Sequence, residues 1–530
     1  MPMLRNCMFR YLGQLVTAIL VLLCFILLKN AAEPPPLWLI ICSGICAVVF
    51  AGWRERFCYL IILGLLCCFE RHFILHYGDT FRTIGSQALI TLRITNADEI
   101  KAYMSIFKIV EPIQLLLFAG GCAAEWHFRS PPLFSAGTAA RRIFAATGKL
   151  AAPLTLAAAA VYQIVPPITD HLKIWDVQQD FFLTRRDFSF HAFNRDRQTP
   201  IFCILVIGES HRKDEFDRLA FRKNTTAPKL MNARERGVLF EFDDMISHYQ
   251  HTWFSVFTLL TRRGEDDRNV LWPEKGLISL FREAGFRTAY LTYQKKTPDN
   301  LGYNYVVNEA DTYINHREFS GSKFDHGMLP PLAGLMKSAA PHQLAVLKMS
   351  GVHFHYNSRY TREFRFFTPC YDSSPGSRSE YRIEDREKLV NTYRNAMAFS
   401  LTFFDEVMKL VDRHPTPAVM VFISDHGVIN YDDGRNAFFG GAKSNFHIPC
   451  FIYGNAAFRK RLPPEQERAL RKNRSLPVTN SYIFDTLVSL ARIGYPEHRP
   501  EMDLTSELAK PAADRMVWVW DKRMHYNRLP

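Results

Sequence analysis

The sequence predicts two parts: an N-terminal membrane domain of five helices and a C-terminal α/β domain with a mostly parallel central sheet. Five long apolar runs predict the first part, because each is near the length that crosses a bilayer. Near-continuous apolar segments that alternate with amphipathic ones predict the second, because strands of a parallel sheet are covered on both faces. Three of these strands run into acidic or histidine residues, which indicates a ligand site at one edge of the sheet.

The apolar runs define the predicted membrane domain, residues 1–169. They cover residues 11–28, 34–53, 57–69, 104–124 and 150–168. The third run is short and has to use flanking residues to cross. The first resembles a signal peptide, but no small-residue cleavage site follows it, so we expect it to be uncleaved.

Basic residues between the runs predict the orientation of the membrane domain. Eight of the basic residues outside the runs fall on one side of the five spans, which is then the cytoplasmic side. An odd number of spans places residues 200–530 outside the cytoplasm, so we expect a multi-pass protein of the bacterial inner membrane with a periplasmic domain. The basic residues are Arg5, Arg10, Arg54, Arg56, Arg129, Arg141, Arg142 and Lys149.

Composition narrows the class of partner. The formal net charge is +13, which suits anionic lipid or a phosphate-bearing glycolipid at a membrane surface, and no nucleic acid is expected. Only Cys203, Cys370 and Cys450 belong to the exported part, too few for a domain held together by disulfides. Residues 170–199 form a linker in which phenylalanines alternate with charged residues. This pattern fits either a segment at the bilayer surface or one packed on the exported domain.

The exported part reads as alternating strands and helices. We expect strands at residues 200–210, 287–293, 342–356 and 417–427, and helices at 274–286 and 387–414. Glu209 and Ser210 end the first strand, His353 and His355 the third, and Asp425 and His426 the fourth. The carboxyl ends of parallel strands meet at one edge of a sheet, so these side chains should converge there.

Glutamate, aspartate and histidine together form a mixed oxygen and nitrogen ligand set. Zinc accepts such a set in a four-coordinate site, and Mn²⁺ is the alternative if oxygens dominate. A bound ion would lower the pKa of a coordinated hydroxyl and neutralise charge on a reacting phosphate.

Two hydroxyls are candidates for a nucleophile. Ser210 follows a strand, but its surroundings read GESHR and lack the second glycine of the G-x-S-x-G elbow. Thr252 precedes an apolar helical run, and a helix N-terminus favours a phosphate. On these residues alone, a simple helix cap is the favoured explanation of Thr252.

Several motifs occur in one order along the chain: ITNADEI from residue 94, VIGES from 206, RKNTTAP from 222, HTW from 251, the run SGVHFHYNSRYTREFRFFTP from 350, and FISDHG from 422. In this order they resemble the membrane-bound phosphoethanolamine transferases of the alkaline phosphatase/sulfatase superfamily, over nearly the whole chain. The resemblance implies an alkaline phosphatase-like periplasmic domain behind the five helices.

The resemblance also implies an activity. Phosphoethanolamine would pass from phosphatidylethanolamine to Thr252, and then from this phospho-threonine to lipopolysaccharide, at lipid A or the inner core, or to another envelope glycan. The residues that it implies are Glu209, Thr252, Asp425 and His426 as zinc ligands, Thr252 also as the nucleophile, His353 and His447 at the phosphoryl group, and Thr95, Asn96 and Glu99 at the lipid headgroup.

The chain departs from the family pattern at a few positions. His355 replaces a proline, Val428 stands where an acidic residue is common, and Ala220-Phe221 replaces Gly-Tyr. The second histidine of the phosphate site is therefore open between His447 and His355.

The alternatives to this activity are three related enzymes and one protein without catalytic activity. A sulfatase needs C/S-x-P-x-R, which is absent. A phosphoglycerol transferase of the lipoteichoic-acid type shares the five-span plan and a threonine nucleophile, but the T-N-x-x-E segment at residues 95–99 argues against it. A membrane-tethered phosphodiesterase would use the same residues. A catalytically dead lipid-binding regulator would have no physical need to keep Glu209, Thr252, Asp425 and His426 together.

Overall fold

The computed structural model describes most of the chain after residue 187 and short stretches before it. The described residues are 15–21, 54, 56–61, 63, 119–127, 165, 185, 187–264, 272, 274–293, 304–315, 322–373, 381–432, 434, 437–520 and 522–530. The chain divides into two compact units, residues 1–177 with 376–380 and residues 178–375 with 381–530.

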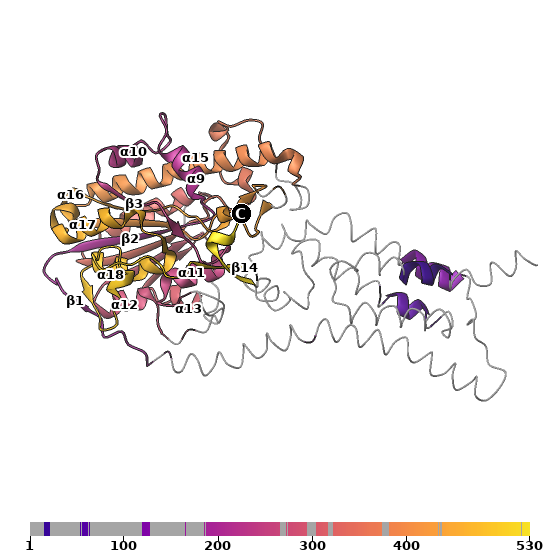
Figure 1. The fold of residues 1–530 in the computed structure, drawn as a ribbon, viewed down its shortest axis with the longest axis horizontal. Helices are drawn as coiled ribbons and strands as arrows, with labels where there is room; N and C mark the ends of the chain where they lie inside the picture. The colour runs from indigo at the N-terminus through magenta and orange to yellow at the C-terminus, as the bar shows by residue number, and fades with distance from the viewer. Residues whose placement is uncertain are drawn as a thin grey trace, which may run out of the picture. The chain divides into compact units, whose positions relative to one another are not determined.

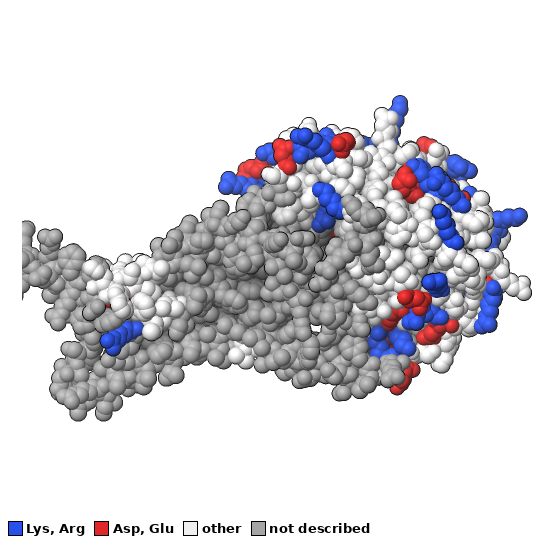
Figure 2. Space-filling model, turned by 180° about the vertical axis from the view of Figure 1, so that it is seen from behind, with Lys and Arg blue, Asp and Glu red and all other residues white. Residues whose placement is uncertain are grey.

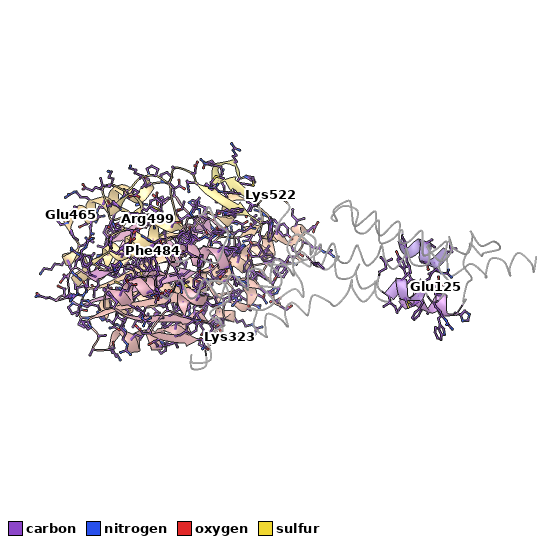
Figure 3. The ribbon with its side chains drawn as sticks, turned by 90° about the horizontal axis from the view of Figure 1, so that it is seen from below. Glu125, Lys323, Glu465, Phe484, Arg499 and Lys522 are labelled. Atoms are coloured by element: carbon purple, nitrogen blue, oxygen red, sulfur yellow. The ribbon has the colours of Figure 1, made fainter. Side chains whose placement is uncertain are left out.

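In the first unit the described residues are helical and hold a buried ion pair. The Arg56 guanidinium donates to both carboxylate oxygens of Glu125, at 2.6 and 3.0 Å, and the Thr17 hydroxyl adds a third hydrogen bond of 2.7 Å. Glu125 is labelled in Figure 3. Among the described residues, no helix combines the length and the apolar character that a membrane crossing requires. The five predicted spans lie largely outside these residues, so the five-helix domain stays a prediction.

The second unit is built on a seven-stranded sheet with the strand order β3-β11-β8-β2-β7-β5-β6 (Figure 1). Every adjacent pair from β8 to β6 is parallel, and only β11 runs against its neighbours. This confirms the prediction of a mostly parallel sheet. The strands are β2 Ile201–Gly208, β3 Leu239–Phe242, β5 Arg287–Thr292, β6 Thr312–Asn315, β7 His342–Lys348, β8 Ala418–Ser424 and β11 Cys450–Gly454.

Helices cover both faces of this sheet. One face carries α9 Lys213–Ala220, α10 Pro228–Glu235, α14 Leu329–Met336 and α15 Arg386–Arg413, and the other carries α11 Thr252–Leu260, α12 Leu277–Glu283 and α18 Ile483–Leu490. Alternate side chains of β2 enter the two cores: Leu205 and Ile207 pack toward α11, whereas Ile204 and Val206 pack toward α15. Because both faces are buried, the strand needs no polar alternation.

Shorter elements complete the second unit. The remaining helices are α13 Asn304–Val307, α16 Ala456–Arg461 and α17 Pro464–Lys472, and the remaining strands are β1 Phe193–Asn194, β4 Met245–Ile246, β9 Ile429–Asn430, β10 Ala437–Phe438, β12 Val478–Thr479, β13 Ile493–Gly494, β14 Met516–Val519 and β15 Lys522–His525.

One predicted strand is wrong in length. The strand expected over residues 342–356 ends at Lys348, because the chain turns at Gly351. This glycine has φ +46°, and a Cβ there would lie 2.6 Å from the Glu209 carbonyl oxygen. Glycine alone fits such a close approach. His353 and His355 therefore lie in the turn that follows the strand rather than in the strand.

The described end of the linker packs on the second unit. Phe190 is fully buried, and its ring contacts those of Phe484 and Tyr495. Phe484, which is labelled in Figure 3, is itself fully buried. Three residues further on, β1 pairs with β13. Of the two interpretations of the linker, packing on the C-terminal domain thus holds for its last residues.

Charges of both signs share the surface. On the face shown in Figure 2, basic side chains lie beside acidic ones over the second unit. Ion pairs such as Arg471 with Glu467 and Arg474 with Asp243 belong to this mixed surface. Acidic side chains among the described residues thus offset part of the positive charge of the basic side chains beside them.

The three cysteines of the second unit, Cys203, Cys370 and Cys450, are free thiols. Cys203 in β2 and Cys450 in β11 are buried, whereas Cys370 is partly exposed. Burial raises the pKa of Cys203 to about 12 and also raises the pKa of Cys450. These three cysteines therefore form no disulfide in the structure.

We expect N-ethylmaleimide to modify Cys370 at pH 8 in the folded protein while Cys203 and Cys450 react at least roughly a hundredfold more slowly, since the thiolate is the nucleophile. Peptide mass spectrometry after timed labelling measures all three in one sample. Guanidinium should equalise the rates. Fast labelling of Cys203 without denaturant would contradict the buried position of β2.

Candidate metal centre

Three neighbouring strands deliver the candidate site to one edge of the sheet. β2 lies between β7 and β8, and the pairing sets Gly208 opposite Ser424 and Ile207 opposite Lys348. Glu209 therefore follows β2 at the level where Asp425 follows β8. The register of the strands, rather than any local motif, places these groups side by side.

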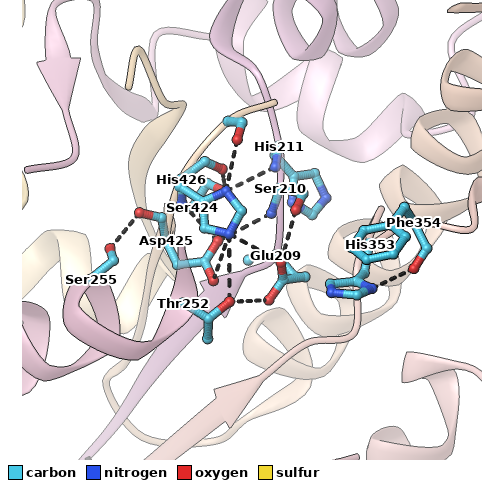
Figure 4. Close-up of polar contacts among 12 residues, drawn as sticks. Glu209, Ser210, His211, Thr252, Ser255, His353, Phe354, Ser424, Asp425 and His426 are labelled. Carbon is cyan, nitrogen blue, oxygen red and sulfur yellow. Dashed lines mark hydrogen bonds and ion pairs between the residues drawn. The ribbon is translucent and has the colours of Figure 1, made fainter. Parts of the chain in front are cut away.

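Glu209, Asp425 and His426 form a compact buried cluster (Figure 4). One ligand atom from each lies within 4.8 Å of the others. The His426 Nε2 atom is 3.3 Å from Glu209 Oε1 and 3.8 Å from Asp425 Oδ2. All three side chains are at most 4% exposed. The structure thus brings together the three non-hydroxyl ligands that the sequence predicts.

Thr252 joins this cluster from another element. It is the first residue of α11, and its Oγ1 donates to Glu209 Oε2 at 2.8 Å and lies 3.5 Å from His426 Nε2. The Ser255 hydroxyl, one turn further along α11, donates to the Asp425 carbonyl oxygen and so ties the helix to the end of β8. A helix N-terminus and a hydroxyl therefore face the same buried carboxylate.

Ser210 supports Glu209 from the side. Its hydroxyl donates to Glu209 Oε1 at 2.8 Å, and its backbone N–H donates to Asp425 Oδ1 at 3.1 Å. Its φ of +64° belongs to the turn that ends β2. Tyr393 of α15 fixes this turn by donating to the Ser210 carbonyl oxygen at 2.8 Å. Ser210 thus orients a carboxylate.

Sequence reasoning missed Lys348, the last residue of β7. Its ammonium is fully buried and donates to Glu209 Oε2 at 2.8 Å and to Asp425 Oδ2 at 3.0 Å. Two backbone carbonyl oxygens, of Gly208 and Met349, lie 3.2 and 3.3 Å from the same nitrogen. The available signal was a lysine directly after the apolar residues 344–347 of a buried strand, where an unpaired ammonium is costly.

Burial and charge act against each other in this cluster. Burial disfavours the Glu209 carboxylate, yet the Lys348 ammonium and His426 lower the pKa of Glu209 well below its ordinary value. Burial raises the pKa of Asp425, and the neighbouring Glu209 carboxylate raises it further. Burial opposes the charged imidazole of His426, but Asp425 and Glu209 raise its pKa. The cluster is thus held by opposite charges in low dielectric.

His353 and His355 take different positions. His353 lies beside the cluster, close enough that its charge lowers the pKa of Glu209, and its Nδ1 faces the Phe354 carbonyl oxygen. The His355 Nδ1 instead forms a 2.7 Å hydrogen bond with the Tyr381 hydroxyl, and the two rings stack. Packing therefore accounts for His355.

The structure does not bring His447 into the cluster. Its Nε2 donates to the Asp243 carbonyl oxygen at 3.0 Å, and burial lowers the pKa of its imidazole. Phe439 packs beside His426 instead, with 6.0 Å between ring centroids. The headgroup residues expected from the sequence, Thr95, Asn96 and Glu99, lie outside the described residues.

The donor set fits a divalent metal ion. The His426 Nδ1 donates to the Gly427 carbonyl oxygen at 2.7 Å, which directs Nε2 toward the carboxylates. Metal-binding histidines are commonly oriented by such a bond. Two carboxylates, one imidazole and one hydroxyl give the mixed oxygen and nitrogen set that zinc accepts.

Comparison with known proteins places this geometry in context. A model of the sulfatase family matches residues 202–493. Phosphoethanolamine transferase EptC of Escherichia coli strain K12 is 22% identical over 342 residues, 62% of this chain and 58% of that protein. EptA of Helicobacter pylori is 23% identical over 315 residues, 57% of this chain and 56% of that protein. The matches thus span somewhat more than half the length of these curated relatives.

Solved structures show the same fold. The periplasmic domain of EptC from Escherichia coli, solved in complex with Zn, has a TM-score of 0.55 at 18% identity and covers 64% of this chain and 96% of that one. The integral membrane lipooligosaccharide phosphoethanolamine transferase A of Neisseria meningitidis has a TM-score of 0.59 at 17% identity and covers 94% of this chain and 97% of that one.

We expect Glu209→Gln and Asp425→Asn each to weaken zinc binding by at least about tenfold, the loss typical of disturbing even the groups that orient ligands. Competition with a chromophoric chelator on the full-length protein in detergent measures this affinity. Asp405→Asn is the matched control, because Asp405 is also buried but bonds the Lys229 N–H on α10. Unchanged affinity in either ligand variant would argue against the site.

Proposed function

The chain belongs to the sulfatase family, and on that premise we propose that it transfers phosphoethanolamine from phosphatidylethanolamine to an acceptor of the cell envelope. The observation that carries the proposal is the position of Thr252, whose hydroxyl meets Glu209 and His426 at the N-terminus of a helix. The curated relatives named phosphoethanolamine transferases support the choice of transferred group. We propose lipopolysaccharide, at lipid A or the inner core, as the acceptor.

The proposed reaction consists of two displacements at phosphorus. The Thr252 oxygen attacks, the bond from phosphorus to the glycerol oxygen breaks, and diacylglycerol leaves with a proton. An acceptor oxygen then attacks the phospho-threonine, and the bond between phosphorus and Oγ1 breaks, which restores Thr252. The hydrogen bond from Thr252 to Glu209 already directs the departing proton at a carboxylate.

The surrounding residues suit a phosphoryl group. At its N-terminus, α11 presents backbone N–H groups, which favour the negative charge of a phosphoryl group. His353 lies beside Glu209, and we propose it as a phosphoryl contact. A bound zinc ion would lower the pKa of the Thr252 hydroxyl and neutralise charge on the transferring group.

The remaining parts of the proposal concern the membrane. We propose an inner-membrane protein whose second unit faces the periplasm, which the fold shared with membrane-bound EptA supports. We propose that the lipid headgroup is contacted by Thr95, Asn96 and Glu99. We also propose His447 as a contact of the phosphoryl group.

Thr252→Ala should reduce transfer by at least about a thousandfold, because it removes the nucleophile. Mass spectrometry of total lipid and lipopolysaccharide from expressing cells should show a phosphoethanolamine mass increment with the wild type and none with the variant. Thr258→Ala is the control, since this threonine lies on the same helix and its hydroxyl only donates back to the Phe254 carbonyl oxygen at 2.9 Å.

The same spectra separate the related activities. Diacylglycerol release without any increment would indicate a phosphodiesterase that passes the group to water. A phosphoglycerol increment would indicate transfer from another phospholipid. An increment that persists in Thr252→Ala would refute the assignment of the nucleophile.

Ser210→Ala should keep at least about a tenth of the transfer activity, because one hydrogen bond to Glu209 is lost while those from Lys348 and Thr252 remain. The rate is read from the lipopolysaccharide increment over time. Complete loss of activity at normal protein levels would restore Ser210 as the nucleophile.

A further inference from the structure

Lys348 contacts the candidate metal ligands, but the proposed reaction does not use it. Its ammonium is fully buried and contacts only oxygen acceptors among the hydrogen bonds described: two carboxylates and two backbone carbonyls. An ammonium has three donor positions, so four acceptors more than satisfy it. A buried lysine held in this way is fixed in place, which a surface lysine is not.

The position of this ammonium is that of a bridging cation. It contacts Oε2 of Glu209 and Oδ2 of Asp425, one oxygen from each carboxylate. Carboxylates that share a cation in this way also occur in two-metal phosphotransfer sites, where the ions lie about 3.5–4 Å apart. Here the bridging place is already filled by a side chain of the protein.

The balance of charge in the cluster also argues against a second metal ion. Glu209, Asp425 and an ionised Thr252 would bring three negative charges into a buried site. One divalent ion together with the Lys348 ammonium would bring three positive ones. A second divalent ion would leave an excess of positive charge, which is costly in a low-dielectric environment. In the absence of a bound phosphoryl group, the side chains of the cluster are therefore balanced by one ion.

We propose that the Lys348 ammonium takes the place of a second divalent cation, so that the site binds a single metal ion. The lysine also bridges the two carboxylates and so holds both near their ligand positions before the ion arrives. Lys348 is thus a positioning residue that acts through Glu209 and Asp425 rather than on the substrate. This inference rests on the metal-dependent function proposed above.

The test is the number of zinc ions that the untagged full-length protein binds in detergent. Equilibrium dialysis followed by elemental mass spectrometry should give one equivalent for the wild type. Lys348→His removes the ammonium and offers an imidazole at the same position, and it should bind two equivalents. Lys348→Met keeps the length of the side chain without its charge or a nitrogen ligand, and it should bind no more than one.

Lys337→His is the matched control, because Lys337 is exposed at the end of α14. It adds a histidine away from the cluster and should still bind one equivalent. Circular dichroism confirms that each variant is folded. If no Lys348 variant folds, the wild-type count can still overturn the proposal, because two equivalents in the wild type would contradict a site for a single ion.

The outcomes also separate this inference from the proposed function. One equivalent in both the wild type and a folded Lys348→His would overturn the role of Lys348 and leave the metal site intact. No zinc on the wild type would overturn the metal site, and this inference would fall with it.

Discussion

Two carboxylates buried side by side repel each other, and the balance of that repulsion is the constraint on which the rest of the site depends. Glu209 and Asp425 are each at most 4% exposed. Removing one partner of a buried ion pair typically costs about 3–5 kcal/mol, because the other charge is left uncompensated. The surroundings therefore have to supply positive charge and hydrogen-bond donors. Lys348, His426, Ser210 and Thr252 provide them, each from a different direction.

The scaffold turns this local requirement into a rigid arrangement. The two parallel neighbours of β2 set the level of Lys348 and Asp425 relative to Glu209 through backbone hydrogen bonds. Tyr393 holds the turn after β2 from one face of the sheet. Ser255 holds α11 against the end of β8 from the other. The proposed nucleophile and the proposed ligands are thus fixed by both layers of helices, which suits the proposed transfer because it requires precise alignment.

Much of the candidate site could be predicted from the sequence, because the apolar runs indicate where the strands end. Glu209, Asp425 and His426 were expected at one edge because each follows an apolar strand, and the structure brings them together. Lys348 could not be found in this way. Whether a lysine at a strand end turns inward depends on partners 139 and 77 positions away in the sequence.

The other differences also have physical causes. His353 and His355 were placed at a strand end, but the turn at Gly351 shortens the strand. His447 was expected at the phosphoryl group on the strength of the family pattern, yet its ring bonds the Asp243 backbone. A motif gives the order of residues along the chain, whereas the direction of a side chain depends on the neighbours that pack around it.

The strand order also affects the timing of folding during synthesis. Of the seven strands of the sheet, the central strand β2 is translated first, and both of its neighbours are translated later. The contact of Ser210 with Asp425 joins residues that are 215 positions apart. Folds that depend on such distant pairings form slowly. Until β8 has been translated, one edge of β2 lacks its hydrogen-bonding partner, so the closed core cannot form. For a chain exported as proposed, this delay leaves an interval in which the nascent polypeptide is still unfolded and can be threaded across the membrane.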